Sequence, residues 1–295
     1  MVTRRRLGSA AGVALALVAL GVLCWSRADE LQRALALVSV ASLVALTALH
    51  LVTLIVRSEA WRLTLAAVEG SVPPRRAVHG ANAGAFLAGS IESHSALPAR
   101  VVLLKQLAGP RAPKATQILV SDAPIFLLEV CATALILCGA TPWGLALLAG
   151  AIVLLFTGGH ASQRFERLAA LRGLKVLRDK RRLAALTGWV SVISAIGAGR
   201  VAIALAACGV SPTPERVGIA FTASGAYALS PVGPGAPVAA TVTAVGTGGA
   251  PIAAGLVLAA TSIGAVIVYA LLVAVTLLAL RQPLSRRVDL RAPSA

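Results

Sequence analysis

Three ionisable residues lie inside long apolar runs, where little water is available to solvate a charge. Arg200 lies in the run 183–208, and Glu129 lies in the run 115–138. Asp122 precedes Glu129 by seven residues, or two helical turns, so both carboxylates occupy one helix face. Ionisable side chains within membrane helices are costly and commonly bind substrates, ions or each other. These residues are therefore the first candidates for a binding site.

Each candidate has a structural alternative. Arg200 and Glu129 lie at matched depths of their runs, so they are expected to form an ion pair that either binds substrate or only locks the bundle. Asp122 precedes Pro124 by two positions, which also suits an N-cap followed by a proline in the first helical turn. In that alternative, Asp122 lies at the membrane surface.

Two further groups of candidates lie where the chain is expected to turn back within the membrane. Glu92, Pro98 and Arg100 follow a short apolar run, and backbone that leaves a helical path there has free N–H groups near the Arg100 guanidinium. Gly233 and Gly235 lie in a segment rich in proline and glycine that cannot continue a helix. We expect these turning points to bind substrate, with Arg100 contacting an anionic headgroup.

The composition places these residues in a membrane protein. Of 295 residues, 58% are apolar and 13% are charged, whereas about a quarter of an average globular chain is charged. The 64 residues between Arg216 and Arg281 carry no charge, enough for about three membrane crossings. A soluble domain and a disordered chain are thereby excluded. The 27 Lys and Arg residues outnumber the 11 Asp and Glu residues, but they lie between apolar runs without interleaved aromatic residues, so no nucleic-acid partner is expected.

The cysteines and histidines do not form a ligand pattern. The four cysteines lie in or beside apolar runs, and the sequence has neither a C-x-x-C motif nor a histidine pair at metal-ligand spacing. A phosphate-binding Gly-x-x-x-x-Gly-Lys loop is also absent from the sequence, so ATP is not expected to be a direct energy source. We therefore expect no disulfide framework, no metal and no cofactor.

The apolar runs predict an all-α polytopic fold of about six spanning helices and two re-entrant helical hairpins. Most charged loops are basic, and basic loops remain in the cytoplasm. Counting crossings from the N-terminal arginines keeps these loops on one side if the run 77–91 enters and leaves on the same face. The runs 217–230 and 238–247 would reach only ~21 and ~15 Å as helices, short of a ~30 Å hydrocarbon core, and so predict a second hairpin. Both termini are then cytoplasmic. The expected spanning helices are 7–26, 34–56, 115–138, 143–159, 183–208 and 251–280, and the expected basic loops are 57–76, 92–114 and 160–182.

The order of these elements repeats within a single membrane domain. Residues 1–138 and residues 139–295 each contain two helices, a hairpin and a further helix, and the second half starts on the opposite face, so an inverted-topology repeat is predicted. Inverted repeats with broken helices are typical of secondary transporters, whose substrate site lies near the repeat interface. Chance recurrence of Ala and Gly is the alternative. The matching positions, offset by 141, are Pro73, Arg75, Gly84, Ala85 and Phe86 with Pro214, Arg216, Gly225, Ala226 and Tyr227.

Four motifs connect this pattern to a known family. They are Arg57-Ser58-Glu59-Ala60-Trp61-Arg62, Leu97-Pro98-Ala99-Arg100, Ser121-Asp122 and Ser230-Pro231-Val232-Gly233-Pro234-Gly235. With these motifs, most of the chain resembles the flippase-like membrane domain of lysylphosphatidylglycerol synthases and its stand-alone relatives. The resemblance implies a protein of the bacterial cell membrane that moves a lipid, or an aminoacylated or glycosylated phospholipid, between leaflets. The two-domain relatives have a separate cytosolic aminoacyltransferase domain, which is not expected here because the chain ends 15 residues after the last apolar run.

The expected mechanism is alternating exposure of a headgroup cavity between the two hairpins. Arg100 and Arg200 are expected to contact phosphate, and Glu129 and Asp122 are expected to balance a cationic or hydroxyl-rich headgroup. The expected partners are membrane lipids, above all an anionic phospholipid. The alternatives are a non-transporting partner of another membrane protein and a lipid-modifying enzyme. The sequence offers no evident nucleophile, base or metal cluster for an enzyme, so enzymatic activity is not expected.

Overall fold

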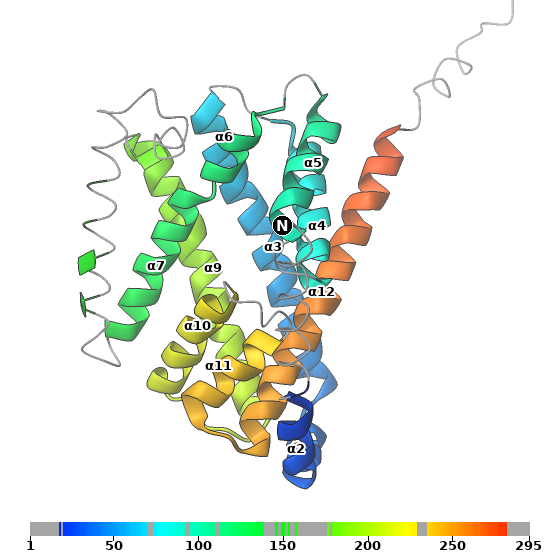
Figure 1. Cartoon of the computed structure of the whole chain (residues 1–295), viewed down its shortest axis with the longest axis vertical. Helices are drawn as coiled ribbons and strands as arrows, with labels where there is room; N and C mark the ends of the chain where they lie inside the picture. Colours follow the sequence, from blue (N-terminus) through cyan, green and yellow to red (C-terminus); the bar gives the residue numbers. More distant parts are fainter. Residues whose placement is uncertain are drawn as a thin grey trace, which may run out of the picture.

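The computed structural model describes residues 18, 20–69, 73–91, 95–109, 112–138, 145–146, 149–150, 153, 157, 176–177, 179–228 and 235–281. Every regular element within these residues is helical, which confirms the predicted all-α class. The ten helices labelled in Figure 1 are α2 (Ala28–Ala36), α3 (Val40–Glu69), α4 (Arg75–Ile91), α5 (Ala96–Ala108), α6 (Ala115–Val120), α7 (Ala123–Cys138), α9 (Lys180–Ala207), α10 (Pro214–Ala228), α11 (Ala236–Val245) and α12 (Gly249–Arg281).

Four helical segments of the described chain are long and apolar enough to cross a membrane. The shortest has 22 residues and extends ~33 Å, which exceeds a hydrocarbon core of ~30 Å. Large apolar side chains such as Val44, Leu135 and Leu271 are at least 60% exposed, which suits surfaces that contact lipid. The chain is therefore a multi-pass membrane protein. The four segments are Val40–Ala67, Ala115–Ile136, Lys180–Ala207 and Gly249–Ala279.

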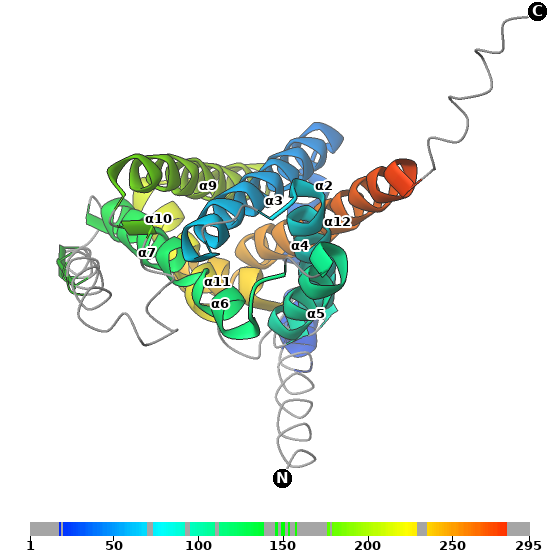
Figure 2. The ribbon, with the colours of Figure 1, turned by 90° about the horizontal axis from the view of Figure 1, so that it is seen from above.

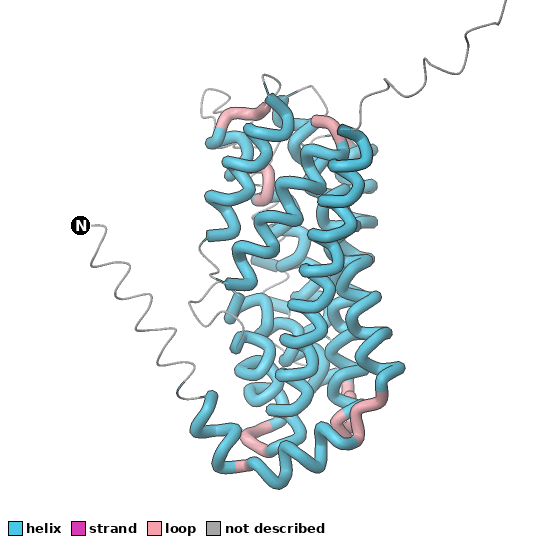
Figure 3. Tube along the Cα trace, turned by 90° about the vertical axis from the view of Figure 1, so that its right-hand side faces the viewer, coloured by secondary structure: helices cyan, strands magenta, loops and turns pink. Residues whose placement is uncertain are grey.

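Two pairs of shorter helices form hairpins. Helices α4, α5, α10 and α11 have 17, 13, 15 and 10 residues, so each is ~15–26 Å long and shorter than a membrane crossing. Figure 1 shows the α4–α5 hairpin in the upper half of the bundle and the α10–α11 hairpin in the lower half. The tube in Figure 3 shows the long helices running side by side, with described loops near both ends.

Viewed from above, helix α3 lies between α9 and α12 (Figure 2). It packs against α4, α6, α7, α9 and α12. One apolar cluster, which includes Trp61, Leu65 and Ile118, fills the bundle on the side of the α4–α5 hairpin. A second cluster, which includes Leu205 and Leu258, packs α9 and α12 on the side of the α10–α11 hairpin. Both hairpins pack against α12, the first through α4 and the second through α11.

The prediction that 57–76 is a basic loop is wrong for most of its length, because α3 continues to Glu69. Trp61 in this segment is only 1% exposed. Arg57 and Glu59 form ion pairs with partners on other elements. Paired charges can remain in a packed membrane helix, so the cluster of charges did not mark its end.

Two further boundaries differ from the prediction. The segment 92–114 is not only a loop, because residues 96–108 form α5, which packs back on α4. The helix expected at 115–138 is divided into α6 and α7 by a turn at Ser121 and Asp122. Most of the spans expected at 7–26 and 143–159 lies outside the described residues, so the total of six spanning helices stays a prediction.

Candidate functional site

A cavity of about 400 Å³ lies between the two hairpins. Its wall is built by α3, by α12 and by the ends of both hairpins that face each other. Cavities of ~300–1,000 Å³ with apolar walls and a few polar groups are typical of small-molecule and cofactor sites. The lining residues are His50, Thr53, Leu54 and Arg57 of α3, Ala85, Phe86, Gly89, Ser90 and Ala96 of the first hairpin, Ser224, Ala236 and Pro237 of the second, and Ala259, Ser262, Ile263 and Val266 of α12.

Arg57 is the charged group in the described cavity wall. It is seven residues after His50 on α3, so the two side chains share one helix face. Its guanidinium forms an ion pair with Glu129 of α7, with 2.8 Å between Nη1 and Oε1 and 3.1 Å between Nη2 and Oε2. The Arg57 side chain is 38% exposed, so the pair remains accessible. The cavity therefore offers a guanidinium with a carboxylate directly behind it.

Arg200 lies behind the part of the wall formed by His50 and Ser262 and is 8% exposed. Its Nη1 donates to Nδ1 of His50 over 2.7 Å, and its Nη2 donates to Oγ of Ser262 over 2.9 Å. Its Nε donates to the carbonyl of Leu46 over 3.2 Å. Because both His50 and Ser262 line the cavity, Arg200 polarises two groups of the cavity wall without lining it.

The predicted Glu129–Arg200 ion pair is wrong. Glu129 pairs with Arg57, and within the described part of the chain the acceptors of Arg200 are uncharged. The side chain of Arg200 reaches α3 and α12, whereas Glu129 on α7 meets α3 two to three turns further along. Glu129 and Arg200 lie at similar depths but are not partners, because the rotation of each helix about its axis determines which neighbouring helix a side chain faces.

Arg100 and Asp122 form a second ion pair next to this site. The guanidinium of Arg100 also lies over the ring of Trp61, with Cζ 4.8 Å from the ring centroid. Trp61 in turn donates from Nε1 to Oγ of Ser121 over 2.8 Å. Asp122 lies at the turn between α6 and α7 and uses its carboxylate to hold α5. Neither Arg100 nor Asp122 lines the cavity.

The remaining predicted residues lie near the ends of the hairpins. Pro98 is exposed in the first turn of α5 and does not line the cavity. Gly235 is the N-cap of α11 and directly precedes two cavity residues, Ala236 and Pro237. Glu92 and Gly233 lie outside the described residues.

His50 and Arg57 were not among the site residues predicted from the sequence. His50 lies inside an apolar run, and it was considered only as a metal ligand. Arg57 was placed in a loop because other charges follow it. Their spacing of seven residues was the available signal, the same signal that brought Asp122 and Glu129 together as candidates.

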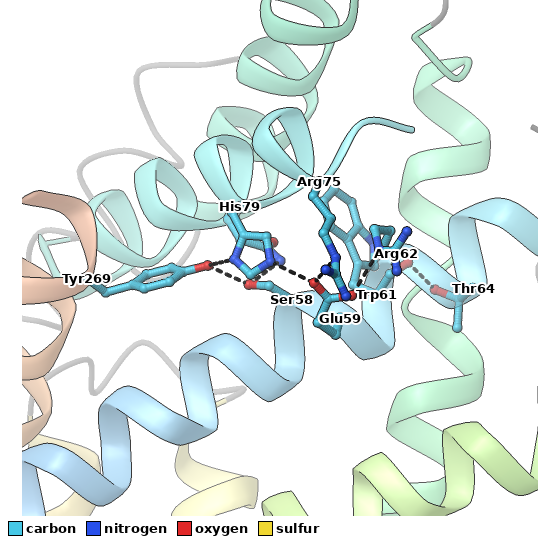
Figure 4. A network of polar contacts seen from close by, with 9 residues as sticks. Ser58, Glu59, Trp61, Arg62, Thr64, Arg75, His79 and Tyr269 are labelled. Atoms are coloured by element: carbon cyan, nitrogen blue, oxygen red, sulfur yellow. Dashed lines mark hydrogen bonds and ion pairs between the residues drawn. The ribbon is translucent and has the colours of Figure 1, made fainter. Parts of the chain in front are cut away.

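A separate polar network joins α3, α4 and α12 (Figure 4). His79 of α4 lies between Glu59 of α3, 3.0 Å from Nε2, and the hydroxyl of Tyr269 of α12, 2.7 Å from Nδ1. The Tyr269 hydroxyl is 2.8 Å from Oγ of Ser58, which also accepts from Nδ2 of Asn82 over 3.0 Å. The sequence analysis quoted Ser58 and Glu59 only as part of a motif and gave His79 no role.

Apolar helices that can cross a membrane, with a mostly apolar cavity between two short hairpins, define an integral α-helical membrane protein. The family model of the lysylphosphatidylglycerol synthase TM region matches residues 9–276, and the chain belongs to this family. No curated protein and no solved structure matches the chain.

Proposed function

We propose that this protein is a flippase-like lipid transporter of the bacterial cell membrane, which moves a phospholipid or an aminoacylated or glycosylated phospholipid between leaflets. The observation that carries the proposal is the cavity between the hairpins, in which the facing ends of both hairpins meet the Arg57 guanidinium, with its partner carboxylate of Glu129 behind it. A volume of about 400 Å³ suits a headgroup, while the acyl chains remain in the surrounding lipid. Membership of the family supports the same function.

The headgroup has two complementary contacts in this proposal. Its phosphate binds Arg57 and the Nε2–H of His50, and Arg200 holds the histidine in the tautomer that donates. A cationic or hydroxyl-rich part of the headgroup binds the carboxylate of Glu129. Arg100 and Asp122 then act indirectly, because their ion pair fixes α5 against α7 and Trp61 beside Arg57.

Transport in this proposal uses the two hairpins as gates. The α4–α5 hairpin is re-entrant from the cytoplasmic face and the α10–α11 hairpin from the outer face, with both termini in the cytoplasm. The packing supports an inverted repeat. The last helix of the second half, α12, contacts α3 and α4 of the first half, and the last helix of the first half, α7, contacts α9 and α10 of the second half. Pro73 and Pro214, which match in the predicted repeat, lie just before α4 and at the start of α10. Movement of either hairpin would open the cavity to one side.

Transport is tested with purified protein in proteoliposomes that contain a fluorescent phospholipid, whose outer-leaflet fraction is bleached by a membrane-impermeant reductant. Arg57→Met is expected to reduce translocation at least tenfold, because the phosphate loses a charge-assisted partner of about 1.5–3 kcal/mol. Arg33→Met is the matched control, since Arg33 lies on the exposed face of α2 away from the cavity. Wild-type protein that folds without moving lipid would favour a partner role, and chemical conversion of the lipid would reveal an enzyme.

The topology is tested with single cysteines in a cysteine-free background. Lys114→Cys, beyond α5, is expected to react with an impermeant thiol reagent only from the cytoplasmic side. Glu215→Cys, at the start of α10, is expected to react only from outside; both native residues are exposed. Reaction of both cysteines from the same side would overturn the inverted arrangement.

A further inference from the structure

The network around His79 can hold a proton without losing a hydrogen bond. Glu59 accepts from Arg62 Nε over 2.9 Å and forms an ion pair with Arg75, so its carboxylate is ionised and acts only as an acceptor. His79 Nε2, 3.0 Å from Glu59, must therefore carry a hydrogen. Nδ1 of His79 can either accept or donate a hydrogen bond, depending on the direction in which the hydroxyls of Tyr269 and Ser58 point.

With a neutral His79, the hydroxyls point toward the ring. Ser58 donates to the oxygen of Tyr269, and Tyr269 donates to Nδ1 of His79; the heavy-atom distances are 2.8 and 2.7 Å. Asn82 donates to Ser58 in this arrangement. Every donor of the chain of contacts has an acceptor.

With a protonated His79, the same contacts run in the opposite direction. Nδ1–H donates to Tyr269, Tyr269 donates to Ser58, and Ser58 donates to the carbonyl of Leu54, which lies 2.9 Å from Oγ. Asn82 still donates to Ser58, which has two lone pairs. The carbonyl of Leu54 is the spare acceptor that allows this reversal. One proton is added at Nδ1, two hydroxyls rotate, and no bond between heavy atoms changes.

We propose that His79, together with Glu59, Tyr269 and Ser58, is a proton-binding site that couples movement of the α4–α5 hairpin to protons. The coupling, but not the proton binding, rests on the proposed transport function. His79 lies on the hairpin, whereas Glu59 and Tyr269 lie on the long helices α3 and α12. Loading His79 with a proton adds an ion pair between hairpin and bundle, so the proton favours the docked hairpin.

The charges around His79 fit this role. Helix α3 presents Glu59 and Arg62, the start of α4 presents Arg75, and α12 presents the Tyr269 hydroxyl. Helix α5 directs Arg100 toward Asp122, and Lys105 of α5 is exposed. Arg75 is 69% exposed while Tyr269 is 2% exposed, so the network leads from the surface into the protein.

The inner end of the network adjoins the cavity wall. The ring of Tyr269 packs against Phe86, with 6.3 Å between centroids, and Phe86 lines the cavity. Leu54, whose carbonyl is the final acceptor, also lines the cavity. A change of hairpin position driven at His79 therefore acts directly on the substrate chamber.

Proton binding is tested by NMR on protein labelled with ¹⁵N-histidine in lipid nanodiscs; the chain has four histidines, and His79→Gln identifies one signal. We expect the His79 signal to change reversibly from the neutral Nε2–H form to the doubly protonated form as the pH is lowered. Glu59→Gln removes the opposing charge and is expected to move the midpoint of this change down by about one pH unit or more. Tyr269→Phe removes the acceptor for Nδ1–H and is expected to move it in the same direction. Tyr227→Phe is the matched control, since it removes the only other tyrosine hydroxyl and leaves the midpoint unchanged.

Coupling is tested in proteoliposomes with a pH difference across the membrane. Wild-type translocation is expected to respond to the gradient, and His79→Gln protein is expected to lose that response. A His79 signal that stays in one form at every pH at which the protein remains folded, or that has the same midpoint in Glu59→Gln protein, overturns the proton site. An equal response of wild type and His79→Gln overturns the coupling. Absence of any lipid movement by wild type would instead overturn the proposed function, while the NMR titration would still report on the proton site. Glu59→Gln and Tyr269→Phe keep the test available if His79→Gln fails to fold.

Discussion

Arg200 donates a hydrogen bond to Nδ1 of His50 across 2.7 Å between α9 and α3. Arginine has no acceptor, so Nδ1 must accept, and a neutral His50 therefore carries its hydrogen on Nε2. The arginine thus determines which histidine atom can donate in the cavity wall. In this way a buried charge acts on the site through a neighbour that lines the cavity.

This relationship predicts different effects for two substitutions of His50. Asn at this position keeps an acceptor close to the place of Nδ1, whereas Phe leaves one Arg200 N–H without a partner. We expect His50→Phe to be less stable than His50→Asn by about 1–3 kcal/mol, measured by thermal unfolding in detergent. Both variants lose the Nε2–H and should translocate lipid more slowly than wild type. Equal stability of the two variants would contradict the role of Arg200.

The Arg57–Glu129 pair predicts a separation of stability from transport. Arg57→Met leaves the Glu129 carboxylate without its partner, and we expect a loss of about 1–3 kcal/mol in unfolding free energy. Arg57→Met combined with Glu129→Met should recover most of that stability, because an apolar pair can replace a partly buried ion pair. The double variant should still fail in the lipid translocation assay. Full transport by a stable double variant would show that the pair only locks the bundle.

Gly255 marks the closest approach of the second hairpin to α12. A Cβ at this position would lie 2.4 Å from Cα of Val238 in α11, and backbone cannot move aside easily. We expect Gly255→Ala to displace the α10–α11 hairpin, lower the thermal unfolding midpoint and reduce translocation.

Gly264 on the same helix is the matched control for Gly255. A Cβ at Gly264 would have no neighbour within 4 Å. Gly264→Ala should therefore be neutral or more stable by up to about 1 kcal/mol, because Ala is the better helix former. If both variants behave alike in the unfolding measurement, the close approach is not what constrains Gly255.

Glu30 predicts a pH-dependent contact between α2 and α12. Its carboxylate accepts from the backbone N–H of Gly249 over 2.9 Å and pairs with Arg27, and these contacts hold the pKa of Glu30 below its usual 4.5. A carboxyl whose pKa is lower in the folded state stabilises the fold above its unfolded pKa, and that contribution is lost as the pH falls through the folded value.

The test for Glu30 compares wild type with Glu30→Gln. Wild type should have the higher unfolding midpoint at about pH 7, and the difference should shrink at about pH 3.5, as the carboxylate becomes protonated. Asp29→Asn is the control, because it removes a neighbouring carboxylate but keeps the Asp29 backbone carbonyl that accepts from Arg33 Nε. A difference between wild type and Glu30→Gln that is independent of pH would exclude the charged form as its source.

The elements that can be identified from the sequence alone are those formed by long apolar runs. Long apolar runs identify α9 and α12, because a membrane crossing requires ~20 mostly apolar residues whatever surrounds it. The runs at 77–91 and within 217–247 are too short to cross a membrane as single helices, and they correspond to α4 and to the α10–α11 hairpin. Charge, in contrast, misplaced the end of α3, because Arg57 and Glu59 have partners that lie far away in the sequence.

The sequence by itself determined that this is an all-α membrane protein with short hairpins, and it singled out Arg200, Glu129 and Asp122 as costly charges. Only the tertiary structure decided their partners, pairing Glu129 with Arg57, Asp122 with Arg100 and Arg200 with His50. The physical reason is that the cost of burying a charge depends on the apolar residues around it in the sequence. The partner of that charge depends on how each helix is rotated about its axis and packed. That rotation is set by contacts between distant helices, and so the composition of the cavity wall followed from the packing.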